Sequence, residues 1–214
     1  MAASGCALGA TSYLVRHGET ASNLLVRYAG QSRESLTARG REQALGLAKR
    51  LTAYSVAEIW TSKIPRAAET AEILADVLGV TVRTEKRLGE IRMGPWEGLT
   101  ETEVAEKHPT SFRVWQEHPD LLSLPGRETL EMVAARVRTV LVEARARRKP
   151  VVLVSHVAPI RVAVLIHLGL PLRLYKRIRV ANTDCFAASG EPLDVRRLGQ
   201  PASMRGELEP AALL

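Results

Sequence analysis

The chain has 214 residues, of which 46% are hydrophobic and 4% aromatic. This length predicts one well-packed domain, with room for a small subdomain and a core built mainly from Leu, Val, Ala and Ile. The formal net charge of +7 implies an acidic partner, and a nucleic acid, a membrane surface or an anionic metabolite would each satisfy it.

Cysteine usage and the apolar segments exclude further classes. Cys6 and Cys185 lie far apart and offer neither a disulfide framework nor metal-ligand spacing. The longest apolar stretch, 162–172, is interrupted by His, Gly and Pro and is too short to span a bilayer. The first ten residues lack the basic and long apolar regions of a signal peptide. We therefore expect a soluble, cytoplasmic protein without a membrane partner.

Short apolar runs alternate with helical patterns along the chain. The sequence predicts buried strands at 12–15, 57–60, 80–83, 151–155 and 185–189. It predicts helices at 37–53, 65–79 and about 128–148; Thr37 caps the first, and the second begins at Pro65 and ends at Gly79. This alternation is typical of α/β proteins. It predicts a three-layer sandwich in which a mostly parallel sheet carries helices on both faces.

Residues 91–127 differ from the rest of the chain in composition and pattern. They contain two His-Pro pairs, two tryptophans and a capping box from Thr100 to Glu103. We interpret them as short helices and loops that form a lid insertion over one end of the sheet. The remainder of 1–198 is expected to complete the same single domain, and residues 199–214 to form a loosely ordered tail.

Polar side chains gather where four successive strands end. In open α/β sheets, ligands bind beyond the carboxyl ends of the strands. The candidates are Arg16 and His17 after the first strand, Arg66 after the second, Glu90 after the third and His156 after the fourth. Each is a weak signal alone, since a lone Arg-His-Gly is usually a turn and a lone Ser-His is often a core histidine. Their occurrence at four successive strand ends favours one shared reaction centre.

These residue types suit phosphoryl transfer. Guanidinium groups bind a dianionic phosphate through charge-assisted hydrogen bonds, and the helix that opens at Pro65 adds free backbone N–H groups. A neutral imidazole is a competent nucleophile, and neighbouring cations would lower its pKa and keep it unprotonated. The Glu90 carboxyl could protonate the leaving oxygen and then activate water. No carboxylates with metal-binding spacing accompany these residues, so we expect neither a metal nor a cofactor.

Five segments, in order, resemble motifs of the histidine phosphatase superfamily, in its phosphoglycerate-mutase-like group. They are LVRHGETASN, TSKIPRAAETA, LGEIRMGPWEGLT, PGRETLEMVAARV and VSHVAPIR, and the resemblance spans residues 12 to about 190. It implies a phosphohistidine intermediate on His17 and proton donation by Glu90. It also implies that Arg16, Arg66 and His156 bind the phosphoryl group, assisted by Asn23.

Two further positions are expected to line the substrate site. Gly30 and Gln31 keep the Gly-Gln pair that is usual in the family. Most members carry Gly-Gly after the second catalytic histidine, whereas this chain has Val157 and Ala158. The Val157 N–H could still reach a phosphate, although valine narrows the permitted geometry. Because the Val-x-Pro sequence resembles α-ribazole-phosphatase-like members, we interpret it as the mark of a subfamily.

The insertion favours hydrolysis over mutase action. Phosphoglycerate mutases typically carry a longer insertion, with added basic residues that grip a second phosphate. Here Trp96, Phe112 and Trp115 suit a small phosphorylated metabolite with a bulky or aromatic leaving group, or they form the insertion's own core. α-Ribazole 5′-phosphate and sugar phosphates are candidate substrates.

Two other functions have to be weighed. A non-catalytic phosphate-binding module would be expected to have lost His17 or Glu90, and both are present. Nucleic-acid binding predicts a basic stripe outside the pocket, but the basic cluster at 145–149 has no interleaved aromatic residues and suits a solvated helix end. We therefore expect no nucleic-acid partner and leave a homodimer open. Among the remaining residues, His108, His118 and His167 are expected to be structural, and Asn182 to shape the pocket wall.

Overall fold

The described part of the chain is built around a mixed, mostly parallel sheet with the strand order β3-β2-β4-β1-β5-β6. The computed structural model describes residues 11–189, 194–199 and 204. The strands are β1 (Ser12–Arg16), β2 (Glu58–Thr61), β3 (Val82–Thr84), β4 (Val151–Ser155), β5 (Cys185–Ser189) and β6 (Asp194–Arg197). Strands β3, β2, β4 and β1 run parallel, whereas β5 and β6 are antiparallel to their neighbours.

The central strands follow the apolar runs of the sequence. β4 is buried along its whole length and pairs in register with β1, with Arg16 opposite Ser155 at the carboxyl end. Such a continuous hydrophobic run is typical of a parallel strand covered on both faces. The third strand begins two residues later than predicted, and its three residues are exposed. The sequence did not predict β6, an edge strand in which only Val195 is buried.

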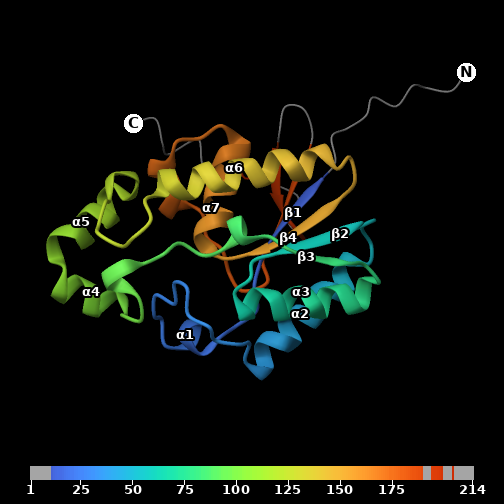
Figure 1. Cartoon of the computed structure of the whole chain (residues 1–214), viewed down its shortest axis with the longest axis horizontal. Coiled ribbons are helices and arrows are strands. Elements are labelled where there is room, and N and C mark those ends of the chain that lie inside the picture. The colour runs from blue at the N-terminus through green and yellow to red at the C-terminus, as the bar shows by residue number, and fades with distance from the viewer. Residues whose placement is uncertain (1–10, 190–193, 200–203, 205–214) are drawn as a thin grey trace, which may run out of the picture.

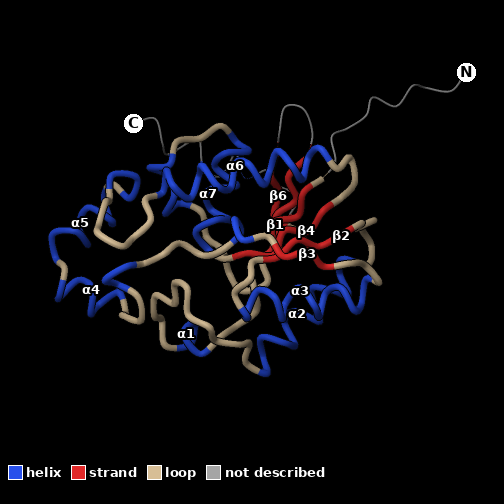
Figure 2. The backbone as a smooth tube through the Cα atoms, in the orientation of Figure 1, coloured by secondary structure: helices blue, strands red, loops and turns tan. Residues whose placement is uncertain are grey.

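Helices cover both faces of the sheet, as Figures 1 and 2 show. The helices α2 (Ala38–Leu51) and α3 (Pro65–Leu78) pack together on one face, and α6 (Leu130–Ala146) and α7 (Val157–Leu168) pack on the other. Thr37 caps α2 by accepting a hydrogen bond from the Gly40 N–H, and Gly79 ends α3 with φ +66°. The predicted α/β sandwich is therefore confirmed.

Two hydrophobic cores stabilise this arrangement. One lies between the sheet and α2 and α3, where Leu47, Leu51 and Leu74 are fully buried. The other lies under α6 and α7 and extends without a break into the insertion, where it includes Trp96 and Trp115. Each fully buried large apolar side chain contributes about 1.5–3 kcal/mol. The insertion is thus held against the sandwich by the same core.

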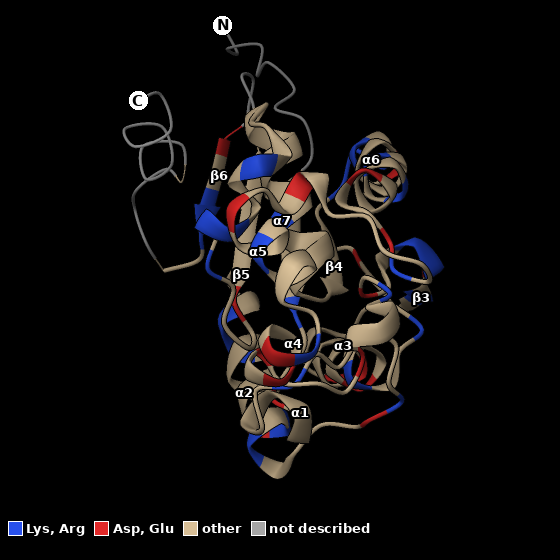
Figure 3. Cartoon of the chain, turned by 90° about the vertical axis from the view of Figure 1, so that its left-hand side faces the viewer, with Lys and Arg blue, Asp and Glu red and all other residues tan. Residues whose placement is uncertain are grey.

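The insertion begins with the 3₁₀ helix η2 (Gly94–Trp96) and continues through α4 (Glu101–Lys107), α5 (Pro109–Glu117) and η3 (Pro119–Leu121). The predicted capping box forms, because Thr100 and Glu103 exchange side-chain to backbone hydrogen bonds. His108 and His118 end α4 and α5, as expected for residues that precede proline. Seen from the side of the insertion, basic residues are interspersed with acidic ones (Figure 3).

Some expectations fall outside the described residues. They concern Cys6, the N-terminal ten residues and most of the tail at 199–214, of which Gly199 and the buried Met204 are described. Cys185 is a free, buried thiol. In the described ranges, none of the helices has the length and apolar character needed to cross a bilayer.

Candidate active site

The carboxyl ends of β1 and β4 place the two candidate histidines side by side. The backbone N–H of His17 donates to the Ser155 carbonyl oxygen at 3.1 Å, and this hydrogen bond continues the parallel ladder between β1 and β4 by one residue. The ring centroids of His17 and His156 are 5.1 Å apart. A cavity of about 150 Å³ opens here, and its walls include Arg16, His17, Asn23, Gly30, Arg66, Glu90 and Val157. The structure therefore brings the predicted residues to one place, with His156 buried directly behind His17.

The contacts of His17 define which ring nitrogen is free to react. Nδ1 lies 2.7 Å from the Gly18 carbonyl oxygen, which can only accept, so Nδ1 carries the proton. Nε2 then has the lone pair, and it accepts a hydrogen bond from Nε of Arg66 at 3.2 Å. Burial, together with the charges of Arg16 and Arg66, holds the pKa of His17 well below its usual value. The imidazole is therefore neutral, and its unprotonated Nε2 is the atom that could act as a nucleophile.

The buried Arg66 and the partly buried Arg16 provide the positive charge of the site. Nη1 and Nη2 of Arg66 donate to the carbonyl oxygens of Ser32 at 2.9 Å and Gly30 at 2.8 Å, and Gly30 supplies its carbonyl from a backbone with φ +48°. Arg16 donates from Nη1 to the Val180 carbonyl oxygen at 2.8 Å. Burial lowers the pKa of Arg16 to about 10, so its guanidinium remains cationic at neutral pH. Because backbone carbonyls anchor these side chains, their charges remain available to an anion.

His156 and Asn23 complete the surroundings of His17. Neither ring nitrogen of the fully buried His156 has a hydrogen-bond partner among the described residues, and its pKa is lowered, first by burial and then by Arg66. Asn23 uses its Oδ1 oxygen to accept from the Thr20 N–H at 3.2 Å and from Nδ2 of Asn182 at 2.8 Å. Its Nδ2 amide group is thus left to donate towards the cavity. Asn182 is not among the residues that line this cavity; its Nδ2 holds the Asn23 side chain and also lies 3.2 Å from the His17 carbonyl oxygen, to which it donates.

Glu90 lies against the first turn of α7. Its carboxylate accepts hydrogen bonds from the N–H groups of Val157 and Ala158, both at 3.1 Å, and from that of Ile91 at 2.9 Å. Val157 adopts ordinary helical geometry as the first residue of α7, so valine is tolerated where a glycine is usual in the family. Glu90 and Val157 are thus direct neighbours, and the N–H of Val157 is directed at an anion.

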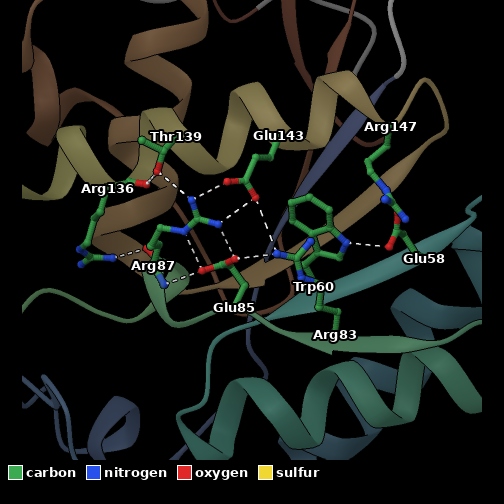
Figure 4. A network of polar contacts seen from close by, with 9 residues as sticks. All are labelled: Glu58, Trp60, Arg83, Glu85, Arg87, Arg136, Thr139, Glu143 and Arg147. Atoms are coloured by element: carbon green, nitrogen blue, oxygen red, sulfur yellow. Dashed lines mark hydrogen bonds and ion pairs between the residues drawn. The ribbon is translucent and has the colours of Figure 1, made fainter.

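A network of ion pairs fixes the segment that leads to Glu90 (Figure 4). The side chain of Arg87, in the 3₁₀ helix η1 (Lys86–Leu88), makes two hydrogen bonds with Glu85, at 2.6 and 2.8 Å, and two with Glu143 of α6, at 2.7 and 2.9 Å. Arg136 of α6 donates to the carbonyl oxygens of Arg87 at 2.5 Å and Glu90 at 3.3 Å. The long helix α6 thus positions Glu90 by holding the backbone carbonyl of that residue.

Close backbone packing positions the loop that follows His17. Gly18 and Gly40, the latter in the first turn of α2, face one another with no room for a side chain. A methyl group at position 40 would lie 2.9 Å from the Glu19 nitrogen and closer still to its carbonyl oxygen. This contact needs two glycines, and it ties the loop that follows His17 to α2.

Sequence reasoning missed several residues that line the cavity. They are Arg27, Tyr28, Ala29, Ile91, Met93, Ala158, Arg161 and Tyr175. Trp115 also lines the cavity, whereas Trp96 is fully buried in the core. Trp96 thus belongs to the core alone, whereas Trp115 belongs to the core and also faces the cavity. The sequence did contain a signal for Arg161. This residue follows Val157 by four positions, so the two side chains lie on the same face of a helix.

The acidic and imidazole groups of the site do not cluster as metal ligands would. Within 11–189, 194–199 and 204, no three His, Cys, Asp or Glu side chains gather closely enough to hold a metal ion. The polar groups around His17 are arginine guanidinium and amide donors, which suit an anion instead.

A neutral histidine, two arginines and a carboxyl group in the wall of one cavity suit phosphoryl transfer. The chain belongs to the histidine phosphatase superfamily (branch 1), whose family model matches residues 12–191. It is 38% identical over 161 residues to phosphoserine phosphatase 1 of Hydrogenobacter thermophilus, which covers 74% of this chain and 76% of that protein. It is also 34% identical to "Probable phosphoglycerate mutase GpmB" of Salmonella choleraesuis, over 79% of this chain and 80% of that one.

Solved structures are similar over nearly the whole chain. A mycobacterial glucosyl-3-phosphoglycerate phosphatase, in complex with VO3, superposes with a TM-score of 0.80 at 30% identity. The match covers 91% of this chain and all of that one. The family, its fold and the phosphatase class predicted from the sequence are thus confirmed.

Proposed function

We propose that the protein is a metal-independent phosphomonoesterase that acts on a small phosphorylated metabolite through a phosphohistidine on His17. The observation that carries this proposal is the state of His17. Its Nδ1 proton is held by the Gly18 carbonyl oxygen, its Nε2 lone pair accepts from Arg66, and the charges of Arg16 and Arg66 both lower its pKa. Such an imidazole is neutral, oriented and adjacent to groups that attract a phosphate dianion.

The reaction follows in two displacements. Nε2 of His17 attacks phosphorus, the bond from phosphorus to the ester oxygen breaks, and Glu90 gives a proton to the leaving oxygen. Water then attacks the phosphohistidine, Glu90 takes the proton of that water, and the P–N bond breaks to release inorganic phosphate. Arg16, Arg66 and the Asn23 amide stabilise the charge on the transferring group, and His156 donates to it from behind.

Hydrolysis is favoured over mutase action by the state of the basic residues in the insertion. Arg92 pairs with Glu128 at 3.8 Å, and Arg113 is exposed on α5 and does not line the cavity. Arg27, at the cavity edge, pairs with Glu103 at 3.1 Å. A mutase has to hold a second phosphate or a phosphorylated product during transfer, and none of Arg27, Arg92 and Arg113 is both unpaired and in the cavity wall to do so.

The test is phosphate release from p-nitrophenyl phosphate in excess EDTA, compared between the wild type and His17→Ala. The proposal predicts turnover that survives the chelator and is lost in the variant. Loss of wild-type activity with EDTA would refute the metal-independent mechanism. A metabolite panel that includes α-ribazole 5′-phosphate, sugar phosphates and phosphoserine would then identify the ester, and conversion of one phosphoglycerate into its isomer would indicate a mutase.

A further inference from the structure

Arg127 is a buried cation without an acidic partner. The residue is 5% exposed, and its Nη1 donates to the Glu128 carbonyl oxygen at 3.0 Å. Nε and Nη2 are buried and have no hydrogen-bond partner among the described residues. The guanidinium lies 4.4 Å from the Trp115 ring centroid and 5.3 Å from that of Trp96. Stacking on aromatic rings offsets only part of the desolvation of a buried charge, so a counter-charge is missing.

Arg161 is a second cation in the same region, and it faces the cavity directly. It lies on α7, where its Nε donates to the Ile178 carbonyl oxygen at 2.7 Å. Its guanidinium is 4.9 Å from the ring centroid of Tyr175, which also lines the cavity. In the described ranges, no carboxylate pairs with Arg161. One nitrogen is thus anchored while the remaining N–H groups can reach a ligand.

The charges around the cavity leave these two arginines uncompensated when a phosphoryl group is bound. Of the residues that line it, Arg16, Arg27, Arg66 and Arg161 are basic and Glu90 alone is acidic. Arg27 is neutralised by Glu103, and a phosphate dianion offsets Arg16 and Arg66. If Glu90 holds the proton for the leaving oxygen, the charges of Arg161 and Arg127 remain.

We propose that the leaving-group half of the cavity binds a carboxylate, so that the substrate is a phosphorylated hydroxy acid or amino acid. Arg161 makes the direct contact, and Arg127 supplies positive charge from behind the Trp115 ring. This inference rests on the proposed function, in which His17 marks the phosphoryl half. It assigns to Arg161 the role of a specificity-determining residue.

The charges, the ring faces and the volume of the cavity narrow the choice of leaving group. Apart from Arg16 and Arg66, which the phosphoryl group offsets, Arg161 is the only unpaired arginine among the described residues that line the cavity. A single guanidinium suits a single carboxylate better than a second phosphate dianion.

An aromatic leaving group would gain stacking energy only from a free ring face. The Trp115 ring already carries Arg127 and also Lys176, whose Nζ lies 5.3 Å from its centroid, and the Tyr175 ring carries Arg161. The volume of about 150 Å³ is also well below the roughly 300–1,000 Å³ of pockets for drug-sized ligands.

The test compares two ligands that differ by one carboxylate, O-phospho-L-serine and O-phosphoethanolamine. Their affinities are measured by isothermal titration calorimetry on His17→Ala protein, which binds without turnover. We expect phosphoserine to bind about 10- to 100-fold more tightly, as for one charge-assisted contact. Adding Arg161→Gln should bring the ratio close to one, and Arg161→Lys should restore part of it. Adding Arg113→Gln instead, which changes an exposed arginine away from the cavity, should leave the ratio of the His17→Ala protein unchanged.

Arg127→Met removes the second charge and keeps much of the side-chain volume. It should weaken phosphoserine binding more than phosphoethanolamine binding. Equal affinities in the His17→Ala protein, or tighter binding of fructose 1,6-bisphosphate than of phosphoserine, would overturn the inference. Hydrolysis of p-nitrophenyl phosphate by the wild type reports separately on the proposed function. Turnover without a carboxylate preference would therefore refute the subsite alone.

Discussion

Replacing Gly40 by alanine should disturb the active site, although Gly40 lies on α2 and no residue of that helix lines the cavity. The added methyl group would lie 2.9 Å from the Glu19 nitrogen, so the 18–19 loop would have to move by roughly 1 Å to restore ordinary contact. Overpacking of this kind costs about 1–3 kcal/mol, against a gain of up to about 1 kcal/mol from the better helix propensity of alanine. Because His17 directly precedes this loop, a 1 Å shift should also lower kcat, by as much as about 100-fold.

The same helix offers a matched control. Gly46 is exposed on α2, and a methyl group there would meet no atom within 4 Å. Gly46→Ala should leave kcat unchanged and raise the free energy of unfolding by about 0.5–1 kcal/mol. Urea unfolding and the hydrolysis of p-nitrophenyl phosphate measure both effects. A Gly40→Ala protein as stable and as active as Gly46→Ala would refute the proposed coupling of α2 to the His17 loop.

Further predictions concern the ion pairs and the titration of the site. Glu85→Gln should destabilise the fold by about 1–3 kcal/mol, since the Glu85 carboxylate is 7% exposed and bound by Arg87. Arg87 lowers the pKa of Glu85, so this contribution is complete above the ordinary carboxyl pKa of about 4.3 and is lost as pH falls through the lowered value. Acid unfolding of the variant should accordingly depend less on pH than that of the wild type. His17 and His156, whose pKa values are lowered mainly by burial, should stay neutral at pH 5.5 in ¹⁵N NMR spectra of the imidazoles, and cationic signals from either would contradict their environment. Because the unfolded chain takes up these protons below about pH 6.5, both histidines should also make stability fall as pH drops from 6.5.

The sequence predicted the parts of the fold that depend on local pattern. The apolar runs gave β1, β4 and β5 to within one residue, and Pro65 and Gly79 marked the ends of α3. β6 was missed because its sequence, DVRR, has one apolar residue and forms an edge strand defined by its partner β5. The antiparallel direction of β5 was not predicted either, since an apolar run carries no information about its orientation.

The residues of the site likewise fall into those that local sequence predicts and those that only tertiary packing brings to the cavity. Arg16, His17, Arg66, Glu90 and His156 could be predicted because each follows a strand, and parallel strands bring their carboxyl ends together. Tyr175, by contrast, lies in the 3₁₀ helix η4 (Leu172–Arg177) and reaches the cavity only because that turn packs against the insertion. The contact of the Glu90 carboxylate with the α7 amides likewise depends on tertiary packing, which no short motif encodes.

The central claim is that His17 carries the phosphoryl group, and trapping that intermediate tests it most directly. The protein is mixed with a ³²P-labelled phosphomonoester in EDTA, quenched within the first turnover and examined for bound label. The account predicts label that is stable in alkali, labile in acid and located on His17, with none in the His17→Ala protein. Turnover with no such label, or label on another residue, would contradict it.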